Sequence, residues 1–146
     1  MRPTVHEQLE GMCRILETSV ATELGNAYTQ ETLRGVVANL RMLDRAWPRL
    51  LPFLHWDNDA MRVLLADARG VLEGDTASEL TAALDAPPAD PFDFDAADQM
   101  NERLRGLLGE ALRGPQPLRA RIAAHLATRA ERFPLRITGA QPKKKT

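Results

Sequence analysis

The 146-residue chain has the length and composition of one globular domain. Its residues are 44% hydrophobic and 27% charged, with a formal net charge of −1. These values exclude a disordered chain and give no electrostatic basis for binding nucleic acid or an anionic membrane. No apolar run approaches the roughly 18 residues of a membrane span, and the first residues lack the apolar stretch of a signal peptide. We therefore expect a cytoplasmic protein without a membrane span.

The first predicted helix covers residues 5–24. Thr4 can cap its first turn, and Glu7 can bond back to the cap to complete a capping box. Apolar residues then recur at steps of three and four, which is the repeat of one helical face. These residues are Leu9, Met12, Leu16, Val20 and Leu24. Cys13, the only cysteine, lies beside them and is expected to be a small buried side chain rather than a reactive thiol.

The second predicted helix ends at Trp47, because Pro48 interrupts its pattern. Gly25 can end the first helix, and Asn26 or Thr29 can cap the second. The apolar residues of this helix again recur at helical spacing: Leu33, Val36, Val37, Leu40, Leu43 and Trp47. Because the turn between the two helices is short, the sequence predicts an N-terminal antiparallel helical hairpin.

The middle of the chain is predicted to form short helical pieces. Residues 48–56 contain two prolines and are expected to be a helical turn or a short kinked helix. Asp57 or Asn58 is expected to cap a third helix, which Gly74 ends. Thr76 then opens a short fourth helix with a second capping box.

The last helices follow a loop over residues 87–94. Asp93 or Asp95 can cap the helix after this loop, and Pro117 suits the first turn of the final one. No segment alternates polar and apolar residues as a strand does. The sequence therefore predicts an all-α fold, a single-domain bundle of about five to seven helices built on the N-terminal hairpin. The helical bundle domain is expected over residues 1–134 and a flexible basic tail over residues 135–146.

Charge is distributed unevenly along the second half of the chain. Residues 57–99 carry a net charge of −9, whereas residues 103–136 carry a net charge of +6. This distribution indicates two segments that pack together or attract a charged partner, although two ordinary solvated faces would give the same pattern.

No motif identifies an active site. His55 is the best candidate for a general base, with Asp59 four residues later to orient its ring, but a packing histidine with one hydrogen bond is the alternative. His125 lies within the last apolar stripe and is expected to be half-buried. The segment from His6 to Glu10 lacks the second histidine of a zinc-protease helix, and residues 57–59 lack the rest of a calcium loop. We therefore predict no established catalytic residue, no metal and no cofactor.

Aromatic residues fall between the predicted helices rather than along their apolar faces. They can line a pocket or form a docking patch, and they can equally close the ends of a bundle. Arginines of the last helix can bind a phosphate or a carboxylate, but they give only a weak nucleic-acid signal. The candidate ligand or partner patch consists of Trp47, Phe53, Trp56, Phe92, Phe94, Arg119, Arg121 and Arg129.

Several short motifs are spread along the chain. They are Glu7-Gln8-Leu9, Leu16-Glu17-x-x-Val20, Glu23-Leu24, Tyr28-x-x-x-Thr32-Leu33-Arg34 and Asn101-Glu102-Arg103-Leu104-Arg105. With these motifs the chain resembles an uncharacterised bacterial family of small all-helical proteins, found beside or fused to phosphotransferase-like kinases and acyl-CoA dehydrogenases. The resemblance implies an accessory role in acyl or alcohol catabolism and implies no active site.

Three functions are compatible with these observations. The leading expectation is a non-enzymatic accessory or interaction protein, which binds a protein partner or forms a homo-oligomer and supports an acyl-CoA dehydrogenase or a phosphotransferase-like enzyme. The alternative is a helical bundle that binds a small apolar or acyl ligand between its aromatic residues. Catalysis centred on His55 and Asp59 comes third.

Overall fold

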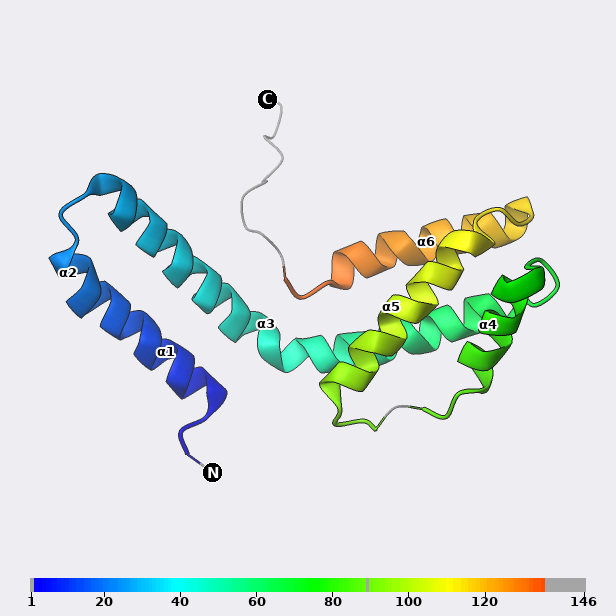
Figure 1. The fold of residues 1–146 in the computed structure, drawn as a ribbon, viewed down its shortest axis with the longest axis horizontal. Helices are drawn as coiled ribbons and strands as arrows, with labels where there is room; N and C mark the ends of the chain where they lie inside the picture. Colours follow the sequence, from blue (N-terminus) through cyan, green and yellow to red (C-terminus); the bar gives the residue numbers. More distant parts are fainter. Residues whose placement is uncertain (1, 89, 136–146) are drawn as a thin grey trace. The chain divides into compact units, whose positions relative to one another are not determined.

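The computed structural model describes residues 2–88 and 90–135, and all regular secondary structure in these ranges is helical (Figure 1). The elements in chain order are α1 (Val5–Ile15), η1 (Leu16–Val20), α2 (Ala21–Glu23), α3 (Ala27–Ala66), α4 (Gly74–Asp85), α5 (Phe94–Ala111) and α6 (Gln116–Arg132). The predicted all-α fold class is therefore confirmed. None of the described helices is both long and apolar enough to cross a membrane. The predicted tail, residues 135–146, lies outside the described ranges apart from Leu135.

The chain divides into two compact units, which we describe separately. Of the described residues, unit 1 comprises those up to Pro48 together with Pro134 and Leu135, and unit 2 comprises those from Arg49 to Phe133. Helix α3 contributes its first half to unit 1 and its second half to unit 2.

Unit 1 begins with the helix predicted from residue 5. Its capping box is confirmed: the Thr4 hydroxyl accepts from the Glu7 amide at 3.2 Å, and the Thr4 amide donates to the Glu7 carboxylate at 2.7 Å. The bond from the Thr4 amide lowers the pKa of Glu7. Helical backbone continues through α1, η1 and α2, with η1 as a π-helical turn. The Asn26 side chain accepts from the Tyr28 amide at 2.7 Å, so Asn26 caps α3, as one of the two predicted alternatives.

Two pairs of residues join α1 to the first half of α3, which lie side by side in Figure 1. Nδ1 of His6 donates to the carboxylate of Asp44 at 2.8 Å, and Sγ of Cys13 lies 4.0 Å from the carbonyl oxygen of Val37. The bond to Asp44 raises the pKa of His6. Cys13 is buried, as predicted. Within the described part of unit 1 the buried apolar residues are Cys13, Val37 and Ala46.

Helix α3 differs most from the predicted elements, because it continues past Pro48 without the expected break. A proline inside a helix removes one N–H from the hydrogen-bond ladder and costs about 3 kcal/mol or more. Burial of the following turn offsets part of this cost, since Phe53 and Leu54 are both buried. Residues 48–56 are helical as predicted, but they are continuous with the helix on both sides and do not form a separate turn or short kinked helix.

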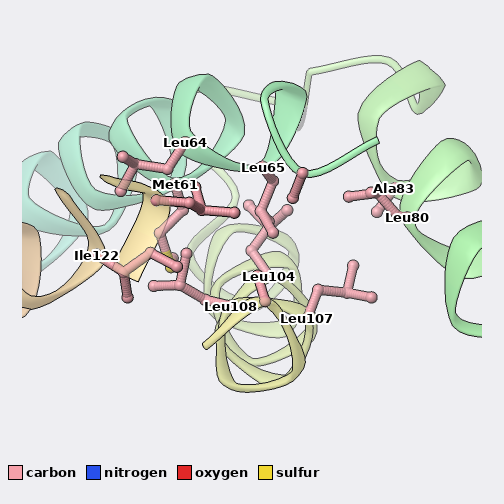
Figure 2. Close-up of a cluster of buried hydrophobic side chains, with 12 residues drawn as sticks. Met61, Leu64, Leu65, Leu80, Ala83, Leu104, Leu107, Leu108 and Ile122 are labelled. Carbon is pink, nitrogen blue, oxygen red and sulfur yellow. The ribbon is translucent and has the colours of Figure 1, made fainter. Parts of the chain in front are cut away.

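Unit 2 contains the larger hydrophobic core, which Figure 2 shows in close-up. Helices α3, α4, α5 and α6 all contribute to it. Its labelled members are Met61, Leu64, Leu65, Leu80, Ala83, Leu104, Leu107, Leu108 and Ile122. Full burial of each large side chain is worth roughly 1.5–3 kcal/mol, so this core is what holds the four helical segments of unit 2 together.

The helix ends in unit 2 were predicted with mixed success. The capping box at Thr76 is wrong: α4 begins two residues earlier, at Gly74, and the preceding Glu73 provides no side-chain cap. The φ angle of Gly74 is +59°, a conformation that glycine adopts without steric cost. Asp93 caps α5 as one of the two predicted alternatives, and Pro117 lies in the first turn of α6 as predicted.

Candidate functional site

The most polar part of the interior of unit 2 is centred on Asp57 of α3, whose side chain is 0% exposed. One carboxylate oxygen accepts from Nε2 of His125 at 2.9 Å. The other accepts from Nδ2 of Asn101 and from Nε of Arg129, both at 2.7 Å. These donors come from α5 and α6, so one carboxylate connects three helices.

Two asparagines complete this set of residues. Nδ2 of Asn101 also lies 2.9 Å from Oδ1 of Asn58, and Nδ2 of Asn58 donates to the carbonyl oxygen of Ala97 at 2.9 Å. We call Asp57, Asn58, Asn101, His125 and Arg129 the Asp57 cluster. Across residues 2–88 and 90–135, no buried side-chain nitrogen or oxygen lacks a hydrogen-bond partner. Satisfied buried polar networks of this kind stiffen a core.

Aromatic rings surround the charged end of the Asp57 cluster. The guanidinium carbon of Arg129 lies 5.5 Å from the ring centre of Phe53 and 5.8 Å from that of Phe133. The ring of Trp56 lies 5.6 Å from that of His125. At these distances the rings attract the cation and shield its bond to Asp57 from water.

A carboxylate that accepts from a histidine can orient the ring of a general base. In the Asp57 cluster, however, both carboxylate oxygens are already occupied and the His125 side chain is only 7% exposed. A substrate would have to displace these contacts to reach the ring. The described residues also contain no group of three metal-ligating side chains. The geometry therefore favours a structural clamp between α3, α5 and α6.

Asp57 and Asn58 correct a prediction, because one of the two was expected to cap a helix and both lie buried inside α3. A sequence signal for the cluster existed. Asp57 lies on the apolar stripe formed by Leu54 and Met61, three residues before and four residues after it. The signal was missed because the assumed break at Pro48 ended this stripe. His125 was expected to be half-buried and is buried.

The predicted patch is distributed over several environments. Phe53, Trp56 and Arg129 meet at the Asp57 cluster, and Phe94 packs in a small apolar cluster with Phe53. Trp47, Phe53 and Trp56 lie within α3 rather than in a linker, because α3 is continuous. Phe92 is 88% exposed in the loop before α5.

The remaining patch residues have other partners. Arg119 bonds the side chain of Gln116 at 2.6 Å, and Arg121 pairs with Asp67. Nε2 of His55, the candidate general base, donates to the carbonyl oxygen of Pro91 at 3.0 Å. This is the single hydrogen bond that the packing alternative requires.

Among the described residues, three arginine–carboxylate ion pairs join the acidic segment of residues 57–99 to the basic segment of residues 103–136. They are Asp57–Arg129, Asp67–Arg121 and Glu79–Arg103. The hydrogen bond from Arg103 lowers the pKa of Glu79, and the same bond raises the pKa of Arg103. The uneven charge thus serves packing between the segments, which was one of the interpretations of the sequence.

Comparisons of the chain with protein-family models, curated proteins and solved structures found no match.

Proposed function

We propose that the chain is a non-enzymatic accessory or interaction protein, and that it binds a protein partner through one face of unit 1. A single observation carries the proposal. Val5 and Met12 of α1 are 46% and 51% exposed, and Val36 and Leu43 of α3 are 45% and 37% exposed. Exposed apolar side chains that gather on one face mark interaction sites. We call these four residues the apolar row.

The spacing of the apolar row places it on one side of the helix pair. Each member directly precedes a residue of the α1–α3 contact, as Val5 precedes His6 and Val36 precedes Val37. It therefore lies about 100° around its helix from that contact. His6 contacts Asp44 and Cys13 contacts Val37, so the contacted residue number in α3 falls as the residue number in α1 rises. Because α1 and this part of α3 run in opposite directions, the step of about 100° from a contact residue to the residue before it points to the same side of the helix pair in both helices.

The same contacts support the predicted N-terminal antiparallel hairpin. The bundle of about five to seven helices in one domain over residues 1–134 stays a prediction, as does the cytoplasmic location. The partner enzyme stays the one that the resemblance implies, an acyl-CoA dehydrogenase or a phosphotransferase-like kinase. Catalysis by His55 and Asp59 gains no support, because His55 donates to a backbone carbonyl group and Asp59 is exposed.

Affinity capture with matched variants tests the proposed function. The immobilised full chain is exposed to native lysate, and the captured proteins are identified by mass spectrometry. Leu43→Glu places a charge in the apolar row, whereas Val63→Glu changes another exposed position of α3, which lies in unit 2. We expect a captured protein, including the chain itself, to be retained by Val63→Glu and lost with Leu43→Glu. Equal capture by both variants, or no capture at all, would contradict the proposal.

A groove in unit 1 favours a second candidate function, the binding of a small apolar or acyl ligand. It has a volume of about 570 Å³ and lies between η1, α2 and α3. Ala21, Leu33 and Val37 provide apolar walls, and Arg34 and Arg41 lie at the same groove. This volume is within the usual range of ligand sites, and an arginine can bind a carboxylate.

Calorimetric titration with dodecanoate tests the second candidate. Ala38→Trp places a large ring in the groove, and Ala120→Trp places the same ring at an exposed position of α6. Binding that is lost only in Ala38→Trp would support the ligand function. Absence of binding to the unmodified chain would exclude this class of ligand.

A further inference from the structure

We infer that the partner seated on the apolar row is a second copy of this chain, with α1 of each copy packed against the first half of α3 of the other. This inference rests on the proposed function, since it names the occupant of the same face. Three features of unit 1 support it: its small core, its charge distribution and the size of its face.

Unit 1 is too poor in buried residues to hold two helices together. Its described part buries only three apolar side chains, Cys13, Val37 and Ala46, whereas unit 2 buries fifteen. Helices of this length are marginal without a packed apolar face. A second helix pair on the apolar row would complete the four-helix arrangement in which such stripes are commonly buried.

The charges of the two helices are compatible with a second copy on the apolar row and favour one arrangement of it. Residues 5–24 carry a net charge of −3, and residues 27–48 carry a net charge of +1. The charged residues are Glu7, Glu10, Arg14, Glu17 and Glu23 in the first segment, and Glu31, Arg34, Arg41, Asp44 and Arg45 in the second. At about 100° per residue, all of these side chains except Glu23 and Asp44 lie roughly 120–220° around their helices from Val5 or Val36, so two copies can meet at the apolar row with few charges between them. A two-fold axis parallel to the helices also brings residues 5–24 of each copy next to residues 27–48 of the other, which places opposite net charges together. An axis across the helices would instead bring residues 5–24 of the two copies together, each with a net charge of −3.

The same two-fold axis pairs the exposed apolar residues. It places α1 of the second copy directly over α3 of the first copy. The two α1 helices then lie at the same height along the helix axes. Met12 of one copy then meets Val36 of the other, and Val5 meets Leu43. These matches follow from the α1–α3 contacts, in which His6 is level with Asp44 and Cys13 with Val37.

The face is large enough for a specific dimer. The segment from Val5 to Glu23 has 19 helical residues, which gives a length of about 28 Å at 1.5 Å per residue. Two helices side by side are about 20 Å wide, so the face measures roughly 560 Å² in projection. Specific interfaces bury about 800 Å² of accessible surface per partner, and accessible surface on a ridged helical face exceeds its projection.

Light scattering after size exclusion tests the inference on the full chain. One copy has a mass of 16.2 kDa, and we expect twice this mass for the unmodified chain and for Val63→Glu. Leu43→Glu and Val36→Glu should give the mass of one copy, while circular dichroism retains the helical signal of unit 2 and loses part of the signal of unit 1. A monomeric unmodified chain at about 100 μM would overturn the inference, as would a dimer that both apolar-row variants leave intact. If the chain is monomeric but still captures another protein through Leu43, only the second-copy inference fails and the proposed function stands.

Disulfide cross-linking tests the arrangement of the two copies. In a Cys13→Ala background, a mixture of the Met12→Cys and Val36→Cys chains should form a linked pair under mild oxidation. Val63→Cys in place of Val36→Cys is the matched control and should not link to Met12→Cys. Efficient linking of Met12→Cys to itself would show that α1 packs on α1, and would overturn the proposed arrangement.

Discussion

Replacing Asp57 with asparagine tests the structural role of the Asp57 cluster. The substitution preserves the size of the side chain but removes its charge, and it replaces one of the two acceptor oxygens that His125, Asn101 and Arg129 contact with an NH2 donor. Breaking a buried ion pair by changing one partner typically costs about 3–5 kcal/mol. The Arg129 side chain is 18% exposed, so water can partly solvate the orphaned cation. We therefore expect Asp57→Asn to lower the free energy of unfolding of unit 2 by about 3 kcal/mol.

Urea denaturation followed by tryptophan fluorescence measures this change. The Trp47→Phe background leaves Trp56 as the reporter, and Trp56 packs against His125 of the cluster. Asp59→Asn is the matched control, since Asp59 is exposed two positions later on the same helix. The control should change the free energy of unfolding by no more than about 0.5 kcal/mol.

A double-mutant cycle separates the ion pair from its surroundings. If the bond between Asp57 and Arg129 carries the effect, Asp57→Asn should cost about 0.5–3 kcal/mol less in an Arg129→Met chain than in the unmodified one. The reasoning is refuted if Asp57→Asn is as mild as Asp59→Asn, because a satisfied buried carboxylate cannot be lost at so little cost.

Other substitutions test the packing, the continuity of α3 and the pH response. Gly114→Ala should lower the free energy of unfolding by about 1–3 kcal/mol, because a Cβ atom there would lie 2.7 Å from Cγ1 of Val71. Gly109→Ala, where nothing lies within 4 Å, should instead raise it by about 0.5–1 kcal/mol in the same urea titrations; equal effects would contradict the close contact. Pro52→Ala should stabilise unit 2 by about 2 kcal/mol, because it restores an N–H inside α3, whereas destabilisation would show that the proline ends a helix. The pKa of His6 is raised by Asp44 from its usual 6.5, so the stabilisation of unit 1 by this pair is complete below pH 6.5 and is lost as the pH rises through the raised pKa. An NMR titration of the His6 ring should show the raised pKa and its return towards 6.5 in Asp44→Asn; an unchanged value in that variant would contradict the pairing.

Local features of this fold were accessible from the sequence. The capping box at Thr4 and the cap at Asp93 depend on side chains and amides three residues apart, so a short motif is enough to predict them. The predicted start of α4 at Thr76 was wrong for a local reason as well. The helix begins at Gly74, whose positive φ angle the capping pattern at Thr76 does not reveal.

The Asp57 cluster was not predictable from such motifs. Its hydrogen bonds join residues separated by 44, 68 and 72 positions, and no local pattern reports which distant donors will meet one carboxylate. The decisive local error was the break assumed at Pro48. A helix that continues through two prolines depends on the burial of Phe53 and Leu54, which is a property of the packed molecule.

The proposed association of two copies implies that unit 1 depends on its partner for stability, whereas unit 2 has the larger core of its own. Hydrogen exchange of the full chain at about 1 μM and at about 100 μM tests this claim most directly, because association stabilises by mass action. We predict that amide protection within residues 5–48 rises with concentration, while protection within α5 and α6 stays constant. Equal protection of residues 5–48 at both concentrations would contradict the claim.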